Sequence, residues 1–379
     1  MRRIYLDNAA TSFPKAPHLG SVVASYIENV SVNLNRTESN ESATVFDTIY
    51  SLRENLCSIY NYKHPESIAF TRNVTEALNW IIKGLFTKED HIIVSSNEHN
   101  AVMRPIIQEQ IAFDRIPSDS KGYSIYSKLE SLIRPNTKAI IINAAGNVSG
   151  AIQDISIPAE IAKKHNIMLF LDCAQASPYL DIDMTDLNLA GVAFTGHKSY
   201  LGPQGTGGML LRRDIAETIN PLISGGTGSE SDKETIPTSL PDRLTPGTEN
   251  LPGLVGLSHS VKYILENKES LYNTIMRRTE ELYLGIEKIN SLRIVGPTLK
   301  DSRTGVISIT SEKMDIAQIS AKLLERGGIE TRVGLHCSPS AHKSLNTFPI
   351  GTLRFSPGPF TTKDEIDFTI SLLKEIVNG

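Results

Sequence analysis

Short apolar runs alternate with amphipathic stretches through the middle of the chain. The apolar runs are Ile68–Thr71, His91–Ser95, Ala139–Asn143, Ile167–Asp172, Val192–Thr195 and Gly208–Leu211. Stretches with helical periodicity, such as Glu76–Leu85 and Pro158–His165, lie between several of them. Strands that alternate with helices are typical of a parallel sheet covered on both faces. The pattern therefore predicts an α/β fold whose large domain holds a mainly parallel sheet.

The pattern changes after about residue 255. The predicted elements are then a long helix, a strand, a helix, a strand and a terminal helix, at Val255–Lys288, Gly305–Thr310, Ile316–Arg326, Gly351–Ser356 and Lys363–Val377. This mixture predicts a smaller α+β domain. We expect a large domain at residues 15–255 and a small domain formed by residues 1–14 and 256–379. The Gly-, Ser-, Thr- and Pro-rich segment 224–250 is predicted to be an ordered functional loop.

Composition and charge narrow the class of protein. The 379 residues carry a net charge of −4, which gives no reason to expect nucleic acid or an anionic membrane as a partner. No apolar run approaches the roughly 20 residues that span a bilayer. The three cysteines, Cys57, Cys173 and Cys337, are too few for a disulfide framework and fit a reducing compartment. The first residues lack the apolar core of a signal peptide, so we expect a cytoplasmic protein.

One lysine closes a predicted strand. The segment Thr195-Gly196-His197-Lys198 follows an apolar run and precedes the Gly-rich stretch 202–208. Ligands of α/β proteins bind beyond the carboxyl ends of the strands. A confined site there would disfavour the ammonium form of Lys198, as Schiff-base chemistry requires. By itself, a solvated lysine in a turn is the commoner case.

An aspartate closes the preceding predicted strand. Asp172 ends the run Ile167–Asp172, and Gln175 follows three residues later. A carboxylate at this place could pair with a pyridinium nitrogen and keep the ring protonated as an electron sink. Gln175 could bond to a ring substituent. Asp172 could equally cap the helix that follows, and the two interpretations remain open on this segment alone.

Three further polar residues follow predicted strands. Thr75 stands near the start of a helix, where free N–H groups and the helix dipole suit a phosphate. His99 could stack on an aromatic ring and move a proton. Asn147 could donate to a cofactor oxygen. Each has a plainer alternative: a helix cap, a structural histidine and a turn residue.

A polar loop near the C-terminus carries a candidate nucleophile. Cys337 follows His336 in a turn-rich segment, with Arg332 and Arg354 nearby in sequence. Positive charge around a thiol favours its reactive form. Arg354, on a predicted strand, offers a planar fork for a carboxylate. The plainer alternative for Cys337 is an incidental loop thiol.

These segments occur together and in one order, and in this the chain resembles the class V aminotransferase-like enzymes that use pyridoxal 5'-phosphate (PLP). Within them it is similar to the cysteine desulfurase and selenocysteine lyase group. The resemblance runs from Tyr5-Leu6-Asp7-Asn8-Ala9-Ala10 to Arg354-Phe355-Ser356, and Asp172-x-x-Gln175 with Gly196-His197-Lys198 is its most specific part. It implies the type I PLP-dependent transferase fold.

The resemblance implies a role for each matching position. On the cofactor side, it implies that Lys198 is the Schiff-base lysine, Asp172 the pyridinium partner and Gln175 the phenolate contact. His99 is expected to stack on the ring and to assist catalysis. The three expected phosphate ligands are Thr75, Thr195 and His197. Asn147 is expected to contact both cofactor and substrate, and Arg332 and Arg354 the substrate, with Arg354 clamping its α-carboxylate. Cys337 is expected to form a persulfide. No metal is expected.

The resemblance also implies partners and a reaction. The reaction would convert L-cysteine to L-alanine and pass sulfur from Cys337 to a sulfur-acceptor protein. Thr248 would reach the neighbouring subunit's phosphate in a homodimer with shared active sites. The alternatives are a selenocysteine lyase, another C–S lyase or an aminotransferase of the same fold. A non-catalytic scaffold or regulator is disfavoured, because Lys198 and its partners are retained and no DNA-binding segment is present.

The chain departs from the group at one loop and follows one subgroup at another. Residues 33–40 lack the Gly- and His-bearing stretch of the group, so the entrance contacts expected there, including that of Arg36, are open. The short spacing from Cys337 to Arg354 is similar to that of group II desulfurases, which use a compact cysteine loop and a dedicated acceptor.

Overall fold

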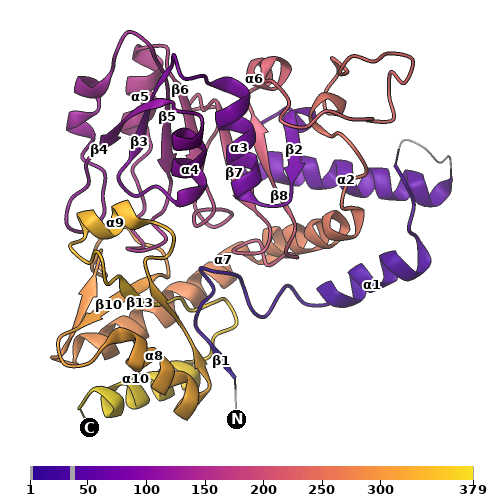
Figure 1. Ribbon diagram of the computed structural model, residues 1–379. Coiled ribbons are helices and arrows are strands. Elements are labelled where there is room, and N and C mark those ends of the chain that lie inside the picture. Colours follow the sequence, from indigo (N-terminus) through magenta and orange to yellow (C-terminus); the bar gives the residue numbers. More distant parts are fainter. Residues whose placement is uncertain (1–2, 35–38, 379) are drawn as a thin grey trace.

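A seven-stranded sheet lies at the centre of the computed structural model, which describes residues 3–34 and 39–378 (Figure 1). In chain order its strands are β2 (Ile68–Thr71), β3 (His91–Ser95), β4 (Ala112–Ile116), β5 (Thr137–Asn143), β6 (Met168–Asp172), β7 (Gly191–Thr195) and β8 (Gly207–Leu211). The spatial order is β2-β8-β7-β6-β5-β3-β4. Strands β3 to β7 pair in parallel, whereas β8 runs antiparallel to β2 and β7. The predicted, mainly parallel sheet is confirmed, with β8 as its one reversed strand.

Both faces of this sheet are buried, which explains why its strands are continuous apolar runs. On β5, Ile140 and Ile142 pack into one hydrophobic cluster, and Ile141 packs into another. The first cluster draws on α2 (Asn40–Ile59), α5 (Ser156–Lys164) and α7 (Leu251–Glu287). The second draws on α3 (Val74–Leu85), α4 (Asn100–Gln108) and α6 (Arg213–Thr218). Helix α1 (Leu19–Asn29) packs along α7.

A second, antiparallel sheet carries the C-terminal part of the candidate chemistry. Its order is β12-β13-β10-β9, and its strands are β9 (Leu292–Val295), β10 (Ile307–Ser311), β12 (Arg332–Gly334) and β13 (Thr352–Phe355). Helices α8 (Ile316–Gly327) and α10 (Lys363–Asn378) share its hydrophobic cluster, and α9 (Pro339–Ser344) lies in the loop between β12 and β13. Strand β1 (Ile4–Tyr5) pairs in parallel with β11 (Ile329–Glu330).

Helix α7 links the two sheets without a break. Its first turns pack in the cluster of the large sheet through Leu251 and Leu257, and its last turns pack under the small sheet through Leu282 and Ile286. The predicted boundary at residue 255 falls inside this helix, and the division into two domains stays a prediction. The segment 224–250 is irregular apart from a short 3-10 helix at Asp242–Leu244. Within the described ranges, no helix is long and apolar enough to cross a membrane.

Gly351 closes the loop that joins β12 to β13, and its substitution tests that closure. Its φ is +87°, and a Cβ there would lie 2.3 Å from the carbonyl oxygen of Gly334. We expect Gly351→Ala to lower the free energy of unfolding by about 2 kcal/mol or more, measured by chemical denaturation. Gly20→Ala in α1 is the matched control: a Cβ meets nothing within 4 Å there, and a helical Ala is favoured by up to ~1 kcal/mol. Equal effects of the two substitutions would contradict this account.

Candidate active site

The carboxyl ends of β6 and β7 place Asp172 and Lys198 on the same edge of the large sheet. Asp172 is the last residue of β6 and is 2% exposed. The two strands pair in parallel with Asp172 opposite Ala193, so the turn that carries Lys198 begins directly beside it. That turn needs Gly196, because a Cβ at this position would lie 2.2 Å from the hydroxyl of Thr206. The sequence-predicted pair is therefore brought together.

Lys198 lies among charges that make its ammonium form unfavourable. Burial lowers the pKa of its amine to about 8, and the carboxylate of Asp172 opposes that shift. The guanidinium groups of Arg354 and Arg332 lower the pKa further. A lysine with this pKa has an appreciable fraction of neutral amine near neutral pH, and only the neutral amine is a nucleophile or a base.

Asp172 is held by the backbone that follows it. Its Oδ1 accepts the N–H of Ala174 at 2.9 Å, within a turn that spans residues 174–179. Burial raises the pKa of its carboxyl, whereas the Ala174 N–H and the charge of Lys198 lower it. No helix directly follows Asp172 in the described chain, so the alternative of a helix cap is wrong, and the residue is held by a turn and by the charge of Lys198.

His99 joins this edge of the sheet through the start of α4. It is the N-cap residue, and its Nδ1 accepts the N–H of Ala101 at 3.0 Å, so the ring proton lies on Nε2. Burial lowers the pKa of His99 to about 4, and the positive charges of Lys198 and Arg332 lower it as well. The ring is therefore neutral at physiological pH.

The cysteine loop is tied to the large sheet beside His99. The amide of Asn100, the first residue of α4, donates to the carbonyl oxygen of Cys337 at 2.8 Å. His336 and Cys337 have φ values of 46° and 59°, two successive left-handed residues that only a well-anchored loop sustains. The Cys337 side chain is exposed, and its Sγ is 3.9 Å from Nη2 of Arg332. The backbone of Cys337 is therefore held at the start of α4, beside His99, while its side chain is exposed.

Asn147 supplies the second tie of the cysteine loop. Its Nδ2 donates to the carbonyl oxygen of His336 at 2.7 Å, and its Oδ1 accepts the hydroxyl of Ser338 at 2.8 Å. The side chain therefore bridges the residues on either side of Cys337. Sequence reasoning expected this amide to face cofactor and substrate, whereas here it holds the loop.

Arg354 joins three distant parts of the chain. It is 1% exposed on β13 and pairs in register with Arg332 on β12. Its Nη2 donates to Oδ1 of Asp7 at 2.7 Å and its Nη1 to the carbonyl oxygen of Asn147 at 3.1 Å. Its Nε is buried and has no hydrogen-bond partner among the described residues.

The remaining predicted ligands are placed in different ways. Thr195, at the end of β7, is 2% exposed, and its hydroxyl is buried with no partner among residues 3–34 and 39–378. Nδ1 of His197 lies 3.1 Å from the Thr11 hydroxyl, and burial lowers its pKa to about 4. Nε2 of Gln175 donates to the carbonyl oxygen of Ala9 at 2.8 Å. Thr75 is exposed in the first turn of α3.

The role expected for Thr248 lies in a neighbouring subunit, so within a single chain it stays a prediction. Thr248 is exposed in the loop before α7 and lines a separate cavity with Thr71, Arg72 and Trp80. Arg36, in the predicted entrance loop, lies outside the described residues.

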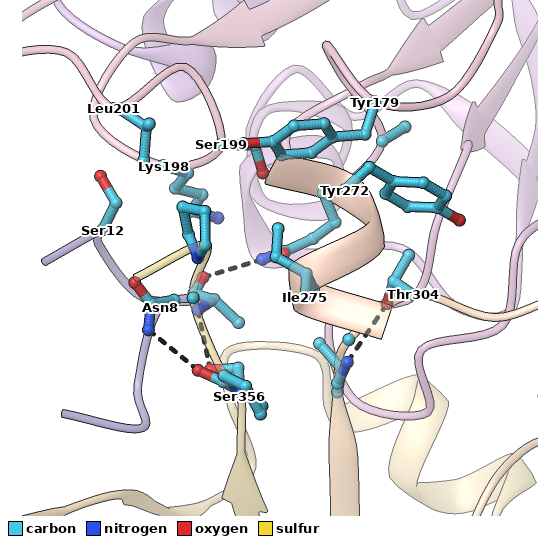
Figure 2. Close-up of a pocket in the computed structure, with 18 of the residues that line it drawn as sticks. Asn8, Ser12, Tyr179, Lys198, Ser199, Leu201, Tyr272, Ile275, Thr304 and Ser356 are labelled. Carbon is cyan, nitrogen blue, oxygen red and sulfur yellow. Dashed lines mark hydrogen bonds between the residues drawn. The ribbon is translucent and has the colours of Figure 1, made fainter. Parts of the chain in front are cut away.

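A cavity of about 70 Å³ lies on the α7 side of Lys198. Figure 2 shows Lys198 and Asn8 on one side of it and Tyr179 and Tyr272 on the other. The two tyrosine rings stack with centroids 5.8 Å apart. Among the sequence-predicted residues, Lys198 and Gln175 line this cavity, whereas His99, Asp172 and Cys337 do not.

Two acids beside the site, the partly buried Asp7 and the buried Glu98, were missed by sequence reasoning. Neither received a role from its position in the sequence. The partner of Asp7 is Arg354, 347 residues away, and no local pattern predicts that contact. Glu98 precedes His99 and is 1% exposed. Its charged side chain, close to the end of an apolar strand, was the signal that could have identified it.

Comparisons with known proteins agree over the length of the chain. The family model of class-V aminotransferases matches residues 4–368. A probable cysteine desulfurase of Borreliella burgdorferi is 30% identical, over 99% of this chain and 92% of the relative. A probable cysteine desulfurase of Methanothermobacter thermautotrophicus is 27% identical, over 98% of this chain and 94% of the relative.

Among solved structures, the apo cysteine desulfurase of Thermococcus onnurineus NA1 superposes with a TM-score of 0.90 at 25% identity, covering 100% of this chain and 95% of that one. Escherichia coli CsdA, a cysteine desulfurase in an S-sulfonic acid form, shares the fold with a TM-score of 0.87 at 22% identity, over 99% and 94% of the two chains.

The charges around Lys198 predict how its reactivity depends on pH. Imine formation with an added aldehyde should rise with a midpoint near pH 8, because burial and two arginines lower the pKa of the amine. Arg332→Gln should move the midpoint to higher pH, whereas Arg293→Gln, on the exposed edge strand β9, should not. Absorbance titration after subtracting a Lys198→Ala baseline measures it. A midpoint near the ordinary 10.5, or one indifferent to Arg332, would count against this electrostatic account.

The two hydrogen bonds of Asn147 predict that this residue fixes the cysteine loop. In Asn147→Ala, the backbone amides of residues 335–338 should exchange with deuterium at least ~10-fold faster, since each lost hydrogen bond is worth about 1 kcal/mol. Asn267→Ala removes one side-chain hydrogen bond on α7 and should leave the loop unchanged. Hydrogen exchange read by mass spectrometry separates the two. Unaltered exchange in Asn147→Ala would show that other contacts hold the loop.

Proposed function

The chain belongs to the class-V aminotransferase family, and from this premise we propose that it is a PLP-dependent cysteine desulfurase that forms a persulfide on Cys337. The observation that carries the proposal is the docking of the cysteine loop on the lysine site. Asn100 holds the Cys337 carbonyl next to His99, and the charges of Lys198 and Arg332 act on the His99 ring. An aminotransferase would need no thiol at this place.

The residues at the strand ends fit PLP. A buried Thr195 hydroxyl without a partner suits a phosphate oxygen, and His197 beside it offers a neutral ring. Lys198 has an amine of lowered pKa for the aldehyde carbon. Asp172 supplies a buried carboxylate for the ring nitrogen, and His99 supplies a flat neutral ring for stacking. Gln175 would contact the phenolate oxygen.

The chain's own groups then divide the work. Bound PLP supplies an electron sink for the bond broken at the substrate Cα. The guanidinium groups of Arg354 and Arg332 orient the substrate carboxylate. The neutral Lys198 amine takes and returns the Cα proton, and His99, on which the charge of Lys198 acts, would assist. The Cys337 thiolate attacks the substrate sulfur. An S–S bond forms between Cys337 and the substrate sulfur, and the C–S bond of the substrate breaks. The substrate Cβ then takes a proton, which gives L-alanine.

The outer sulfur of the persulfide would be transferred at the protein surface. Because the Cys337 side chain is exposed, a second protein can reach its outer sulfur. We infer transfer to the thiol of a sulfur-acceptor protein. The described cysteines are all unpaired, which supports a reducing, cytoplasmic compartment.

We propose further that two copies form the active unit. Thr248 and Thr75 are exposed in one chain, and a second copy would bring Thr248 to the phosphate held by Thr75. The exposed, stacked rings of Phe46 and Tyr50 on α2 offer an apolar surface for that copy.

Product analysis tests the proposed reaction. Given L-cysteine and a reducing thiol, the protein should release alanine and sulfide in equal amounts, and Cys337→Ser should lose at least ~100-fold of that activity because the sulfur has no acceptor. Lys198→Ala should abolish it. Pyruvate and ammonia in place of alanine would indicate elimination, and a keto acid with an aminated product would indicate an aminotransferase. Undiminished alanine from Cys337→Ser would refute the persulfide.

Mixed dimers test the shared site. Lys198→Ala and Thr248→Ala each damage every site of their own homodimer. A mixed dimer of the two has one site with both residues intact. We expect co-expression to restore about half of the wild-type activity per dimer, as for any site built from two chains. Restoration that stays at the level of the separate variants would argue that Thr248 acts within one chain or not at all.

A further inference from the structure

Glu98 is a buried carboxyl group that the proposed reaction leaves without a role. Its side chain is 1% exposed, between the end of β3 and the start of α4. Oε1 accepts the hydroxyl of Ser95 at 2.6 Å and the amide N–H of Asn143 at 2.8 Å. Oε2 is buried and has no hydrogen-bond partner within the part of the chain that the structure describes.

The place of Glu98 relates it to Asp172. Asn143 is the last residue of β5 and pairs in register with Asp172, the last residue of β6. The amide that Glu98 accepts is therefore directly across from Asp172, and the two carboxyl groups act on each other electrostatically. Both are nearly inaccessible to water. Two neighbouring buried carboxyl groups do not both ionise easily.

The other groups around Glu98 do not neutralise a charge on it. No lysine or arginine within the described ranges lies within ion-pair distance of it. Arg115 on β4 acts on it electrostatically, but the Arg115 guanidinium donates to the sulfur of Met103 instead. Tyr126 and His99, the other titratable neighbours, are uncharged. An anion at Glu98 would be desolvated and unpaired, a costly state.

The two acids differ in what offsets their burial. Asp172 has the charge of Lys198 nearby and the N–H of Ala174. Burial raises the pKa of Glu98 to about 8, against its ordinary 4.5; the Ser95 contact opposes this shift, and the charge of Asp172 adds to it. A negative charge is therefore favoured at Asp172 over Glu98, because Asp172 has the positive charge of Lys198 to offset its burial.

We propose that Glu98 is the neutral partner of Asp172, a positioning residue that holds the proton of the pair so that Asp172 alone is the anion facing the cofactor nitrogen. The inference rests on the proposed function for the identity of that cofactor. It assigns Glu98 no contact with substrate or cofactor. Its Oε1 also ties the Ser95 and Asn143 strand ends together, which fixes the loop that presents His99.

Infrared titration of the cofactor-free protein tests the proposal. Wild type should show the carbonyl band of a protonated carboxylic acid at neutral pH, lost with a midpoint near pH 8. Glu98→Gln should lack the band, whereas Glu312→Gln, at an exposed site, should keep it. In Asp172→Asn the midpoint should fall to lower pH. That shift occurs only if Asp172 is charged when Glu98 loses its proton, because replacing an uncharged aspartic acid with asparagine would remove no charge.

Stability against pH gives an independent readout. The folded-state pKa of Glu98 is raised, so its favourable contribution is complete below about pH 4.5 and is lost as pH rises towards 8. The melting temperature of Glu98→Gln relative to that of wild type should therefore rise steadily over that range. A merely structural loss would lower the melting temperature equally at every pH.

Two results would overturn the proposal: no protonated carboxylic acid in the wild type at neutral pH, or a midpoint that Asp172→Asn leaves in place. Both measurements use protein without cofactor or substrate. They can therefore fail while desulfuration is confirmed, and succeed while it is refuted.

Discussion

Desolvation of charged groups at the carboxyl ends of β5, β6 and β7 is the constraint that shapes this site. Parallel pairing brings Asp172 and the Lys198 turn together, and the small sheet closes over them with the buried Arg354. In that setting each charge needs a partner. Arg354 forms an ion pair with Asp7, and Asp172 is stabilised by the N–H of Ala174. Lys198 has a lowered pKa, so its charged form is less favoured. The same desolvation that is costly in the folded protein makes the Lys198 amine reactive.

The reactive thiol is held to this desolvated site although it is itself exposed. The large sheet supplies both ties, the amide of Asn100 and the side chain of Asn147, while the small sheet supplies the loop. Two left-handed residues at His336 and Cys337 leave the side chain outside while the backbone is anchored inside. The reaction we propose would use this arrangement, with sulfur captured at the site and delivered at the surface by the exposed Cys337. Helix α7 spans the interface that makes this arrangement possible.

Local patterns predicted what local forces decide. Strands such as β2 and β3 appeared at their observed bounds, because a strand buried on both faces is an uninterrupted apolar run. The reversal of β8 was not predictable, since an apolar run carries no information on strand direction. The contacts of Asn147 and Asp7 were not predictable either, because their partners lie 189 and 347 residues away in the sequence. The class of chemistry came from the resemblance, whereas the charge balance around Lys198, including Glu98, needed the three-dimensional arrangement.

The central claim is that burial among opposing charges makes Lys198, and no other lysine, the attachment point of the cofactor. Lys15 is a natural internal control, because burial lowers the pKa of its amine to about 8 as well, yet its Nζ is engaged by the carbonyl oxygen of His197 at 2.8 Å. Borohydride reduction of the PLP-loaded protein, followed by peptide mass spectrometry, decides between them. The account predicts one pyridoxyl group per chain, on the peptide that contains Lys198. A pyridoxyl group on Lys15, or none on Lys198, would contradict it.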